Sequence, residues 1–345
     1  MTSLPSQTIL VTGAAGFIGF HMARRLLAAG HRVIGLDALT DYYDPALKTR
    51  RLEILQAFPD YVTVTARLEE PGLLRALFER ERPTRVIHLA AQAGVRYSID
   101  EPRSYVEANL IGTFELLEAA RAFPPEHMLL ASTSSAYGAN EKMPYAETDK
   151  ADWPMSFYAA TKKATEGMAH SYAHLYGLPT TMFRFFTVYG TWGRPDMALF
   201  KFTRAILTDQ PIDVYNHGDM SRDFTQVDDL TWAMEQLLSA VPPAAEGRGA
   251  PLPGDSLSPV APFRVVNIGN SAPVKLLDFI EAIERATGRS ARKNMMDMQP
   301  GDVPATWADA GLLTQLIGPM PRTDLQDGVG EFVDWYRDYM RLNSA

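Results

Sequence analysis

The stretch TILVTGAAGFIG, residues 8–19, decides the fold of this chain. A short apolar run leads into a glycine-rich turn, and an amphipathic helix is predicted over residues 20–29. This order of strand, turn and helix is the context that a dinucleotide-binding fingerprint requires. Gly13 permits the tight turn, Gly16 lets the backbone approach a pyrophosphate, and Gly19 lets the helix pack against the strand. The pyrophosphate would lie at the helix N-terminus, on N–H groups that have no intrahelical partner.

The next predicted strand, RVIGLD at residues 32–37, supports this interpretation because it ends in an acid. Asp37 follows Gly19 by eighteen residues. A carboxylate there accepts hydrogen bonds from the adenosine ribose and repels a 2′-phosphate, which favours NAD over NADP. Two alternatives stay open: Asp37 is a simple turn residue, or Arg50 and Arg51 allow a dual or reversed cofactor preference.

Composition excludes several classes of function. The 345 residues are 46% hydrophobic, enough for one large domain or two intimate ones, yet no apolar run approaches the eighteen residues of a membrane span. Residues 1–7 lack the pattern of a signal peptide, and the absence of cysteine fits a cytoplasmic protein. The net charge of −8 with dispersed basic residues argues against nucleic acid, and seven scattered histidines predict no metal site.

Strand and helix patterns alternate through the first half of the chain. This alternation predicts an α/β fold, a doubly wound parallel (Rossmann) sheet with helices on both faces. We expect an NAD-binding domain over residues 1–185 and a smaller C-terminal α/β lobe for the substrate over 186–345. The helix at 228–240 is predicted to return to the first domain, and residues 242–262 form a Pro/Gly-rich loop. The remaining strands are predicted at 62–65, 85–90, 128–132, 180–186 and 265–268, and the helices at 71–82, 106–123, 154–175, 276–287 and 324–341.

A phenol and an ammonium are predicted on one face of the helix at 154–175. Tyr158 and Lys162 stand four residues apart in the run YAATK. A neighbouring ammonium favours the phenolate, so this pair predicts a general base. The strand at 128–132 leads into the hydroxyl-rich run STSS at residues 132–135, and ligands bind at such strand ends in open α/β sheets.

With these features the chain resembles the extended short-chain dehydrogenase/reductase superfamily. Members of that superfamily use a Ser/Thr, a Tyr and a Lys to move a proton while NAD moves the hydride, and Thr133, Tyr158 and Lys162 match those positions. Further blocks are similar to the UDP-glucuronate 4-epimerase family of nucleotide-sugar epimerases. These are DYYDPALK (41–48), AAQAGVRYS (90–98), FFTVYG (185–190), RPDMALFKF (194–202), SRDFT (221–225) and QPGDV (299–303), so that the resemblance covers nearly the whole chain.

The resemblance implies a role for each matching residue. Tyr158 is the base at the sugar 4-hydroxyl, Lys162 lowers its pKa and binds the nicotinamide ribose, and Thr133 hydrogen-bonds the reacting oxygen. The implied NAD-binding residues are Gly13, Gly16, Phe17, Ile18, Gly19, Asp37, Lys48, Ala90, Tyr158 and Lys162. The implied substrate-binding residues are Thr133, Ser134, Ser135 and Thr187 at the uronate carboxylate, Arg194 and Arg222 at the UDP moiety, Asp302 at a ribose, and Arg96 in a loop facing the sugar. No metal ligand is implied.

One departure from the family pattern lies after the third predicted strand. Arg67 stands where the family usually has an Asp near the adenine amino group, so that contact is not carried over. The resemblance implies a tightly bound NAD, a UDP-sugar substrate and a homodimer, with the helices at 106–123 and 157–175 suited to the interface. The alternatives are a UDP-glucuronate decarboxylase, a UDP-glucose 4-epimerase and a non-catalytic NAD-binding sensor.

Overall fold

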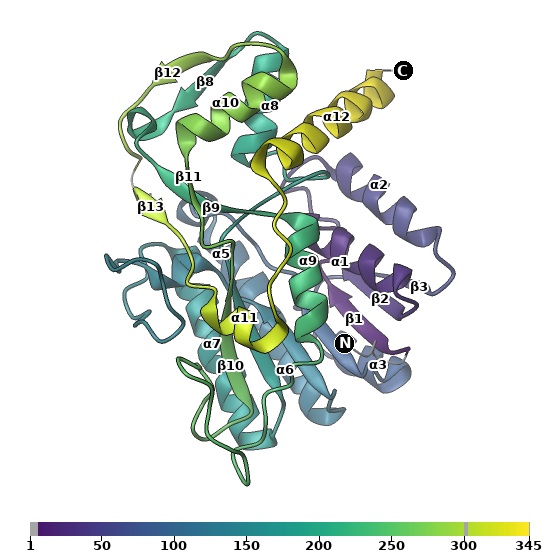
Figure 1. The fold of residues 1–345 in the computed structure, drawn as a ribbon. Helices are drawn as coiled ribbons and strands as arrows, with labels where there is room; N and C mark the ends of the chain where they lie inside the picture. Colours follow the sequence, from purple (N-terminus) through teal and green to yellow (C-terminus); the bar gives the residue numbers. More distant parts are fainter. Residues whose placement is uncertain (1–5, 300–302, 345) are drawn as a thin grey trace.

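The computed structural model describes residues 6–299 and 303–344, and its core is one seven-stranded sheet (Figure 1). Every neighbouring pair in this sheet is parallel, which confirms the predicted doubly wound fold. In sheet order the strands are β10 (Phe263–Ile268), β6 (Thr180–Phe185), β5 (His127–Ala131), β4 (Arg85–His88), β1 (Thr8–Thr12), β2 (Arg32–Asp37) and β3 (Tyr61–Thr65). The order reverses between β1 and β4, and ligands bind outside the carboxyl ends of the strands at such a point.

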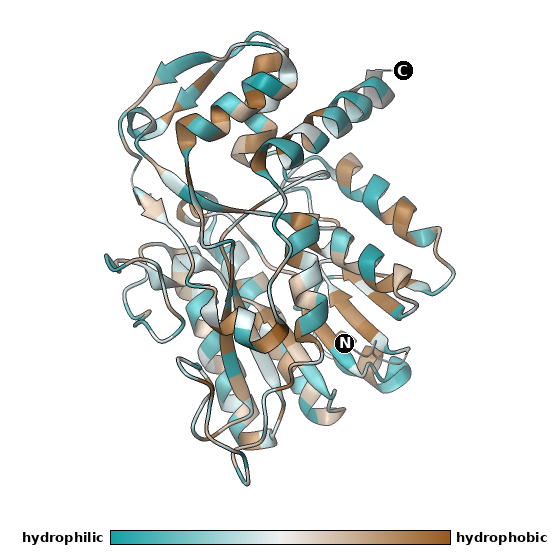
Figure 2. Cartoon of the chain, viewed as in Figure 1, coloured by the Kyte–Doolittle hydropathy of each residue, from teal (hydrophilic) through white to brown (hydrophobic). Residues whose placement is uncertain are grey.

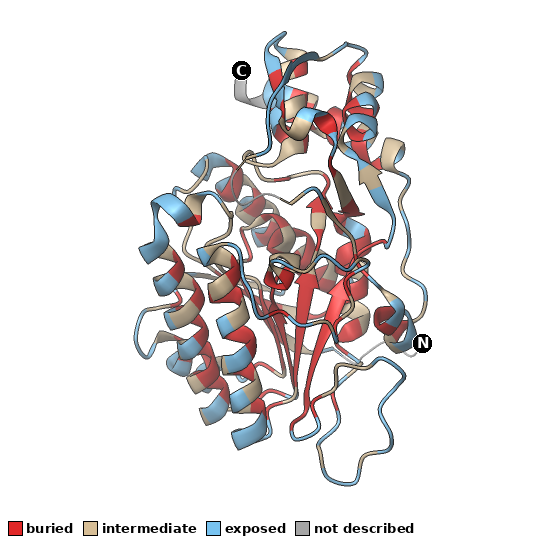
Figure 3. Ribbon diagram, turned by 90° about the vertical axis from the view of Figure 1, so that its left-hand side faces the viewer, coloured by how far each residue is buried: buried red, intermediate tan, exposed pale blue. Residues whose placement is uncertain are grey.

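Helices cover both faces of the sheet, which leaves its strands largely buried except for the edge strand β3 (Figure 3). The apolar side chains of α1 (Phe17–Ala28), α9 (Val227–Leu237) and α11 (Gly311–Ile317) pack in one core with the strands. Those of α3 (Leu73–Glu81), α6 (Gly112–Ala122) and α7 (Phe157–Tyr176) pack in a second core. The strands of this sheet carry runs of hydrophobic residues, whereas the helices alternate apolar and polar residues (Figure 2). Helix α2 (Pro45–Gln56), which the sequence pattern did not predict, packs beside α1.

The first helix begins earlier than its apolar pattern indicates. α1 starts at Phe17 rather than at residue 20, with Gly16 as its N-cap. Gly19 therefore lies inside the first helical turn, and the glycine-rich turn itself is only residues 13–16. The cap residue has no side chain, so the N-terminus of α1 opens directly toward the carboxyl edge of the sheet.

The helix predicted over 106–123 is not one regular α-helix. Two short helices, α4 (Tyr97–Asp100) and α5 (Pro102–Tyr105), precede a π-helix, η1 (Val106–Ile111), which continues into α6. The π-helix carries Asn109, whose amide donates to the Gln92 carbonyl oxygen and to Thr161 Oγ1 and accepts from the Gln92 N–H. These bonds join η1 to the loop after β4 and to α7, and the wider π turn places Asn109 in the interior.

A second lobe stands beyond the carboxyl edge of the large sheet (Figure 1). It contains a four-stranded sheet, a two-stranded sheet and three helices around a core that includes Phe200, Phe279 and Phe332. The strands of the four-stranded sheet are β7 (Thr187–Tyr189), β9 (Ser221–Gln226), β11 (Pro273–Lys275) and β13 (Ala305–Thr306), and those of the two-stranded sheet are β8 (Pro211–Val214) and β12 (Arg292–Met295). The helices are α8 (Ala198–Leu207), α10 (Leu276–Thr287) and α12 (Leu325–Ser344), and a 3-10 turn, η3 (Tyr215–Gly218), follows β8. Another 3-10 turn, η2 (Ser134–Tyr137), follows β5 of the large sheet.

The chain passes between the two lobes more than once. The elements β10, α9 and α11 come after residue 185, yet they pack with the seven-stranded sheet. The second lobe is therefore not one continuous segment of the chain. The loop at 242–262 leads back into β10, and its last part is held in place. Asp255 forms a buried ion pair with Arg264, and Ser258 hydrogen-bonds His170 of α7. None of the helices described in the structure is both long and apolar enough to cross a membrane.

Candidate active site

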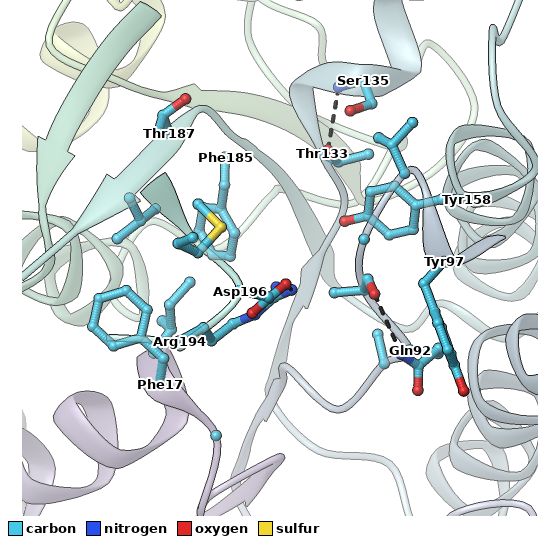
Figure 4. Close-up of a pocket in the computed structure, with 18 of the residues that line it drawn as sticks. Phe17, Gln92, Tyr97, Thr133, Ser135, Tyr158, Phe185, Thr187, Arg194 and Asp196 are labelled. Carbon is cyan, nitrogen blue, oxygen red and sulfur yellow. Dashed lines mark hydrogen bonds and ion pairs between the residues drawn. The ribbon is translucent and has the colours of Figure 1, made fainter. Parts of the chain in front are cut away.

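The carboxyl edge of the large sheet and the second lobe enclose one cleft of about 1110 Å³. Figure 4 shows Tyr158 and Thr133 on one side of this cleft and Arg194, Asp196 and Thr187 on the other. With one exception, every residue proposed from the sequence lines the cleft. The exception is Asp302, which lies outside the described residues. The lining residues are Gly13, Gly16, Phe17, Ile18, Gly19, Asp37, Lys48, Ala90, Arg96, Thr133, Ser134, Ser135, Tyr158, Lys162, Thr187, Arg194 and Arg222.

The glycine turn forms a cradle of backbone atoms, and any residue other than glycine at these positions would place its Cβ against that backbone. Gly13 has a φ of +72°, and a Cβ there would lie 2.8 Å from the Ala90 nitrogen. A Cβ on Gly19 would lie only 1.9 Å from the Gly13 carbonyl oxygen, and one on Gly16 2.9 Å from the same atom. Together with the open N-terminus of α1, this cradle fits the pyrophosphate of a dinucleotide.

Asp37 ends β2 and also holds the glycine turn. One carboxylate oxygen accepts from the Ala15 N–H at 2.9 Å, and the other accepts from the Leu39 N–H at 2.8 Å. The turn-residue interpretation is therefore satisfied, and the same carboxylate faces the cleft where the adenosine ribose of a bound dinucleotide would lie. The local structure accommodates both roles at once.

Two basic residues that follow β2, Lys48 and Arg51, donate hydrogen bonds to backbone carbonyl oxygens of the protein. Arg51 is fully buried, and its Nη1 donates to the Ala15 carbonyl oxygen at 2.8 Å while Nη2 donates to the Trp192 carbonyl oxygen. Lys48 donates from Nζ to the Thr40 carbonyl oxygen at 2.6 Å, and burial lowers its pKa. Arg51 is thus committed to fixing the turn and does not offer the phosphate contact that an NADP preference requires.

Thr133, Tyr158 and Lys162 meet at the end of β5. Thr133 caps η2 through a hydrogen bond from the Ser135 N–H, and its hydroxyl lies near enough to the Tyr158 phenol to lower the pKa of that group. Lys162 is buried one turn further along α7 and donates from Nζ to the Ala131 carbonyl oxygen at 2.8 Å. The phenol, a hydroxyl and an ammonium therefore lie together as the spacing predicts.

Burial affects the pKa of the phenol more than the groups beside it do. We expected Lys162 to lower it, but burial raises the pKa of Tyr158, while the Thr133 hydrogen bond and the charge of Arg194 act against the rise. Burial also lowers the pKa of Lys162 to about 8, which Glu166 partly opposes. Desolvation is the largest cause of both pKa shifts because charged forms are costly away from water.

Asp196 and Tyr42 complete the far wall of the cleft, and sequence reasoning missed both. Asp196 accepts from Arg194 Nε at 3.0 Å and pairs with its Nη2, and Tyr42 donates to Asp196 at 3.2 Å. Burial, followed by the Asp196 charge, raises the pKa of Tyr42 to about 12, so its hydroxyl remains protonated. The available signal was the short Arg-Pro-Asp spacing, which brings a carboxylate back onto the guanidinium.

The two other arginines expected at the substrate come from separate parts of the chain. Arg96 precedes α4, and its guanidinium lies 5.1 Å from the ring centroid of Tyr215 in η3. Arg222 of β9 donates from Nη1 to the Ser221 and Pro304 carbonyl oxygens. Arg67, at the adenine end of the cleft, forms an ion pair with Glu69.

This fold and site define a class: a doubly wound dinucleotide-binding protein with a Thr–Tyr–Lys set beside the nicotinamide end of the cleft. The chain matches the model of the NAD dependent epimerase/dehydratase family over residues 9–248 and belongs to that family. It is 56% identical to the "Probable UDP-glucuronate 4-epimerase" of Rhizobium meliloti (strain 1021), over 97% of this chain and 99% of the relative. It is 46% identical to UDP-glucuronate 4-epimerase 4 of Arabidopsis thaliana, over 96% of this chain and 76% of the relative.

Solved structures give the same grouping. The UDP-glucuronic acid 4-epimerase of Bacillus cereus in complex with UDP-glucuronic acid and NAD superposes with a TM-score of 0.85 at 31% identity, covering 96% of this chain and 99% of that one. The UDP-glucose 4-epimerase of Thermotoga maritima with UDP-glucose gives a TM-score of 0.82 at 28% identity, covering 96% and 99%.

Proposed function

We propose that this protein interconverts UDP-glucuronate and UDP-galacturonate by 4-epimerisation, using tightly bound NAD. The observation that carries the proposal is one cleft that joins a dinucleotide cradle to Thr133, Tyr158 and Lys162, with further hydroxyls at Ser135 and Thr187. The relative at 56% identity is named as this kind of epimerase, and a solved neighbour holds both UDP-glucuronic acid and NAD.

The chain's own residues handle the proton. Tyr158 Oη accepts the proton of the sugar 4-hydroxyl and later returns it, while Thr133 would donate a hydrogen bond to the reacting oxygen. Lys162 Nζ stays buried beside them and binds the nicotinamide ribose. The chemistry supplied by NAD is hydride exchange at sugar C4, through a 4-keto sugar that turns to present its other face. Arg194 and Arg222 anchor the diphosphate so that only the sugar turns.

The hydroxyl groups around the sugar explain why carbon dioxide is retained. The 4-keto uronate is a β-keto acid, and it loses CO₂ when its carboxylate bond stands perpendicular to the ketone plane. Ser134, Ser135 and Thr187 line the cleft beside Thr133 and would hold the carboxylate near that plane. This restraint favours the epimerase over a decarboxylase that shares the same early steps, and a carboxylate subsite disfavours UDP-glucose.

We assign NAD binding to the lobe built on the seven-stranded sheet, to which α9 and β10 also belong. We assign UDP-sugar binding to the second lobe. We also propose a cytoplasmic homodimer. Apolar side chains exposed on neighbouring elements support the dimer: Val106 and Ile111 of η1, Phe114 of α6 and Phe157 of α7. Sedimentation at micromolar concentration tests the dimer, and Phe114→Glu should yield a monomer.

The test of function is incubation of the purified protein with UDP-glucuronate without added cofactor, followed by NMR of the products. UDP-galacturonate of unchanged mass supports epimerisation with retained NAD. UDP-xylose or a UDP-4-keto-pentose would instead assign the protein to the decarboxylases. If neither forms, even with NAD added, UDP-glucose is the next substrate, and inactivity there as well leaves a non-catalytic NAD-binding sensor.

A further inference from the structure

A buried charged cluster lies directly behind the catalytic residues. Glu166 of α7 pairs with Arg184 of β6 through two hydrogen bonds, 2.9 Å from Nε and 2.8 Å from Nη2. Ser132, which follows β5, donates to the same carboxylate at 2.6 Å. The three residues are at most 4% exposed. The cluster joins α7 to two neighbouring strands at the edge where the cleft begins.

The cluster and Lys162 together tie both residues that precede Thr133 to the helix that carries the base. Tyr158, Lys162 and Glu166 are spaced four apart on α7 and therefore share one face. Lys162 Nζ holds the Ala131 carbonyl oxygen at 2.8 Å, and Glu166 holds the Ser132 hydroxyl. The segment that ends in Thr133 is thus fixed against α7 at two consecutive residues. A displacement there would change the distance from the Thr133 hydroxyl to the phenol.

Glu166 also supplies negative charge near a buried ammonium. Among the groups packed around Lys162, His88 of β4 is held neutral because burial lowers its pKa to about 3, and Tyr158 carries a protonated phenol. Glu166 faces Arg184 and, at 3.0 Å, Lys163. Even with these cations beside it, Glu166 raises the pKa of Lys162 against the effect of burial. The carboxylate therefore favours the ammonium that the reaction needs.

We propose that Glu166 is a positioning residue for the epimerisation: through Ser132 it holds Thr133 in place beside Tyr158, and through its charge it keeps Lys162 as an ammonium. This role rests on the proposed function. A purely structural ion pair is the competing interpretation, since many buried pairs can be replaced by apolar residues at little cost in stability. The two interpretations differ in what they predict for the kinetics and for the titration of Lys162.

Three variants separate the two contributions of Glu166. Glu166→Gln removes the charge, and we expect kcat to fall roughly tenfold or more with KM within about twofold, since the sugar contacts remain. Its alkaline limb of kcat should move to lower pH by about 0.5 unit or more, because the ammonium loses its anion. Ser132→Ala removes only the tether and should lower kcat without moving that limb. The double variant E166Q/R184M leaves no unpaired buried charge and should shift the limb as E166Q does, even if E166Q alone folds poorly.

The matched control is Asp255→Asn. This variant breaks another buried bidentate pair, between Asp255 and Arg264, which lies at the start of β10 and thus at the end of the strand away from the cleft. A purely structural role for Glu166 predicts that both variants lose stability alike and that kcat and its pH profile stay unchanged in the folded fraction. That result, in E166Q or in the double variant, overturns the proposal.

A titration that needs no substrate keeps this test separate from the proposed function. The pKa of the Lys162 Nζ group can be followed by NMR in protein labelled with ¹⁵N-lysine, with its signal assigned through Lys162→Met. We expect a lower pKa in E166Q than in the unaltered protein, and an unchanged value in Asp255→Asn. Failure of the unaltered protein to convert UDP-glucuronate refutes the proposed function, whereas an unchanged Lys162 titration in E166Q refutes the role of Glu166.

Discussion

Glu147 should make the protein less stable as the pH rises, and its replacement by Gln should remove that dependence. Its side chain is buried between the loop after η2 and β10, where Oε1 accepts from the Asn267 N–H at 2.8 Å. Burial raises the pKa of Glu147 from 4.5 to about 7, with the Asp309 charge acting in the same direction and the Asn267 N–H opposing it.

The sign follows from proton uptake. Between pH 4.5 and about 7 the folded protein holds a proton at Glu147 that the unfolded chain has lost, so the free energy of unfolding falls as the pH rises. A difference of about 2.5 pKa units corresponds to a destabilisation of the folded protein by roughly 3 kcal/mol. This destabilisation is fully present above pH 7 and absent below pH 4.5. Glu147→Gln keeps the acceptor for Asn267 but has no charge to lose. The variant should therefore match the unaltered protein near pH 4.5 and exceed it by about 3 kcal/mol at pH 8.

Urea unfolding at pH 5, 6, 7 and 8 measures this difference directly. Glu141→Gln is the control, since Glu141 lies in the same loop but is exposed. We expect the Glu141 variant to follow the unaltered protein at every pH. A Glu147→Gln difference that stays constant from pH 5 to pH 8 would show that the buried carboxyl does not titrate as argued, and the reasoning would be refuted.

The remaining predictions concern the cleft. Tyr158→Phe should lower kcat by about 10²–10⁴-fold while the protein still co-purifies with NAD, measured by product NMR and by the absorbance of released cofactor; turnover within tenfold would exclude the phenol as the base. Thr187→Val or Ser135→Ala should raise the fraction of UDP-pentose among the products, and its absence at measurable turnover would count against the carboxylate restraint. Gly19→Ala should abolish NAD retention or folding, because its Cβ would lie 1.9 Å from a carbonyl oxygen, whereas Gly167→Ala on α7, with open space around its Cβ, should retain both.

Sequence periodicity identified most of the large sheet but not every helix beside it. The strands carry short apolar runs, such as Ile9–Val11 and Met128–Ala131, and such runs are easily recognised. Helix α2 was missed because its buried face includes Lys48 and Arg51 as well as Leu47 and Leu55. These two cations donate to loop carbonyl oxygens, so the helix is buried without an apolar stripe. The position of β10 beside β6 also depends on a return of the chain after the 242–262 loop, which no local pattern specifies.

Residues that touch ligands were easier to predict than residues that hold them in place. The glycines of the turn follow one another at fixed spacings, and so do Tyr158 and Lys162 on α7. All of these residues line the cleft. Asp196 and Asn109 instead also contact side chains or backbone from distant parts of the chain: Asp196 contacts Tyr42, and Asn109 contacts Gln92 and Thr161. These distant partners become visible only once the chain is folded, whereas the Arg194–Asp196 pair is signalled by its spacing of two residues.

The phenol shows why the chemistry could not be read from spacing alone. A Tyr and a Lys four residues apart suggested that the ammonium would lower the pKa of the base, but burial raises it, and Lys162 Nζ is engaged with the Ala131 carbonyl oxygen. The ionisation of Tyr158 therefore depends on charges brought close in three dimensions, of which Arg194 is one. A cationic nicotinamide bound beside the phenol would act in the same direction. In this site the base is poorly ionised until the cleft is filled, so proton transfer is coupled to ligand binding rather than set by the helix alone.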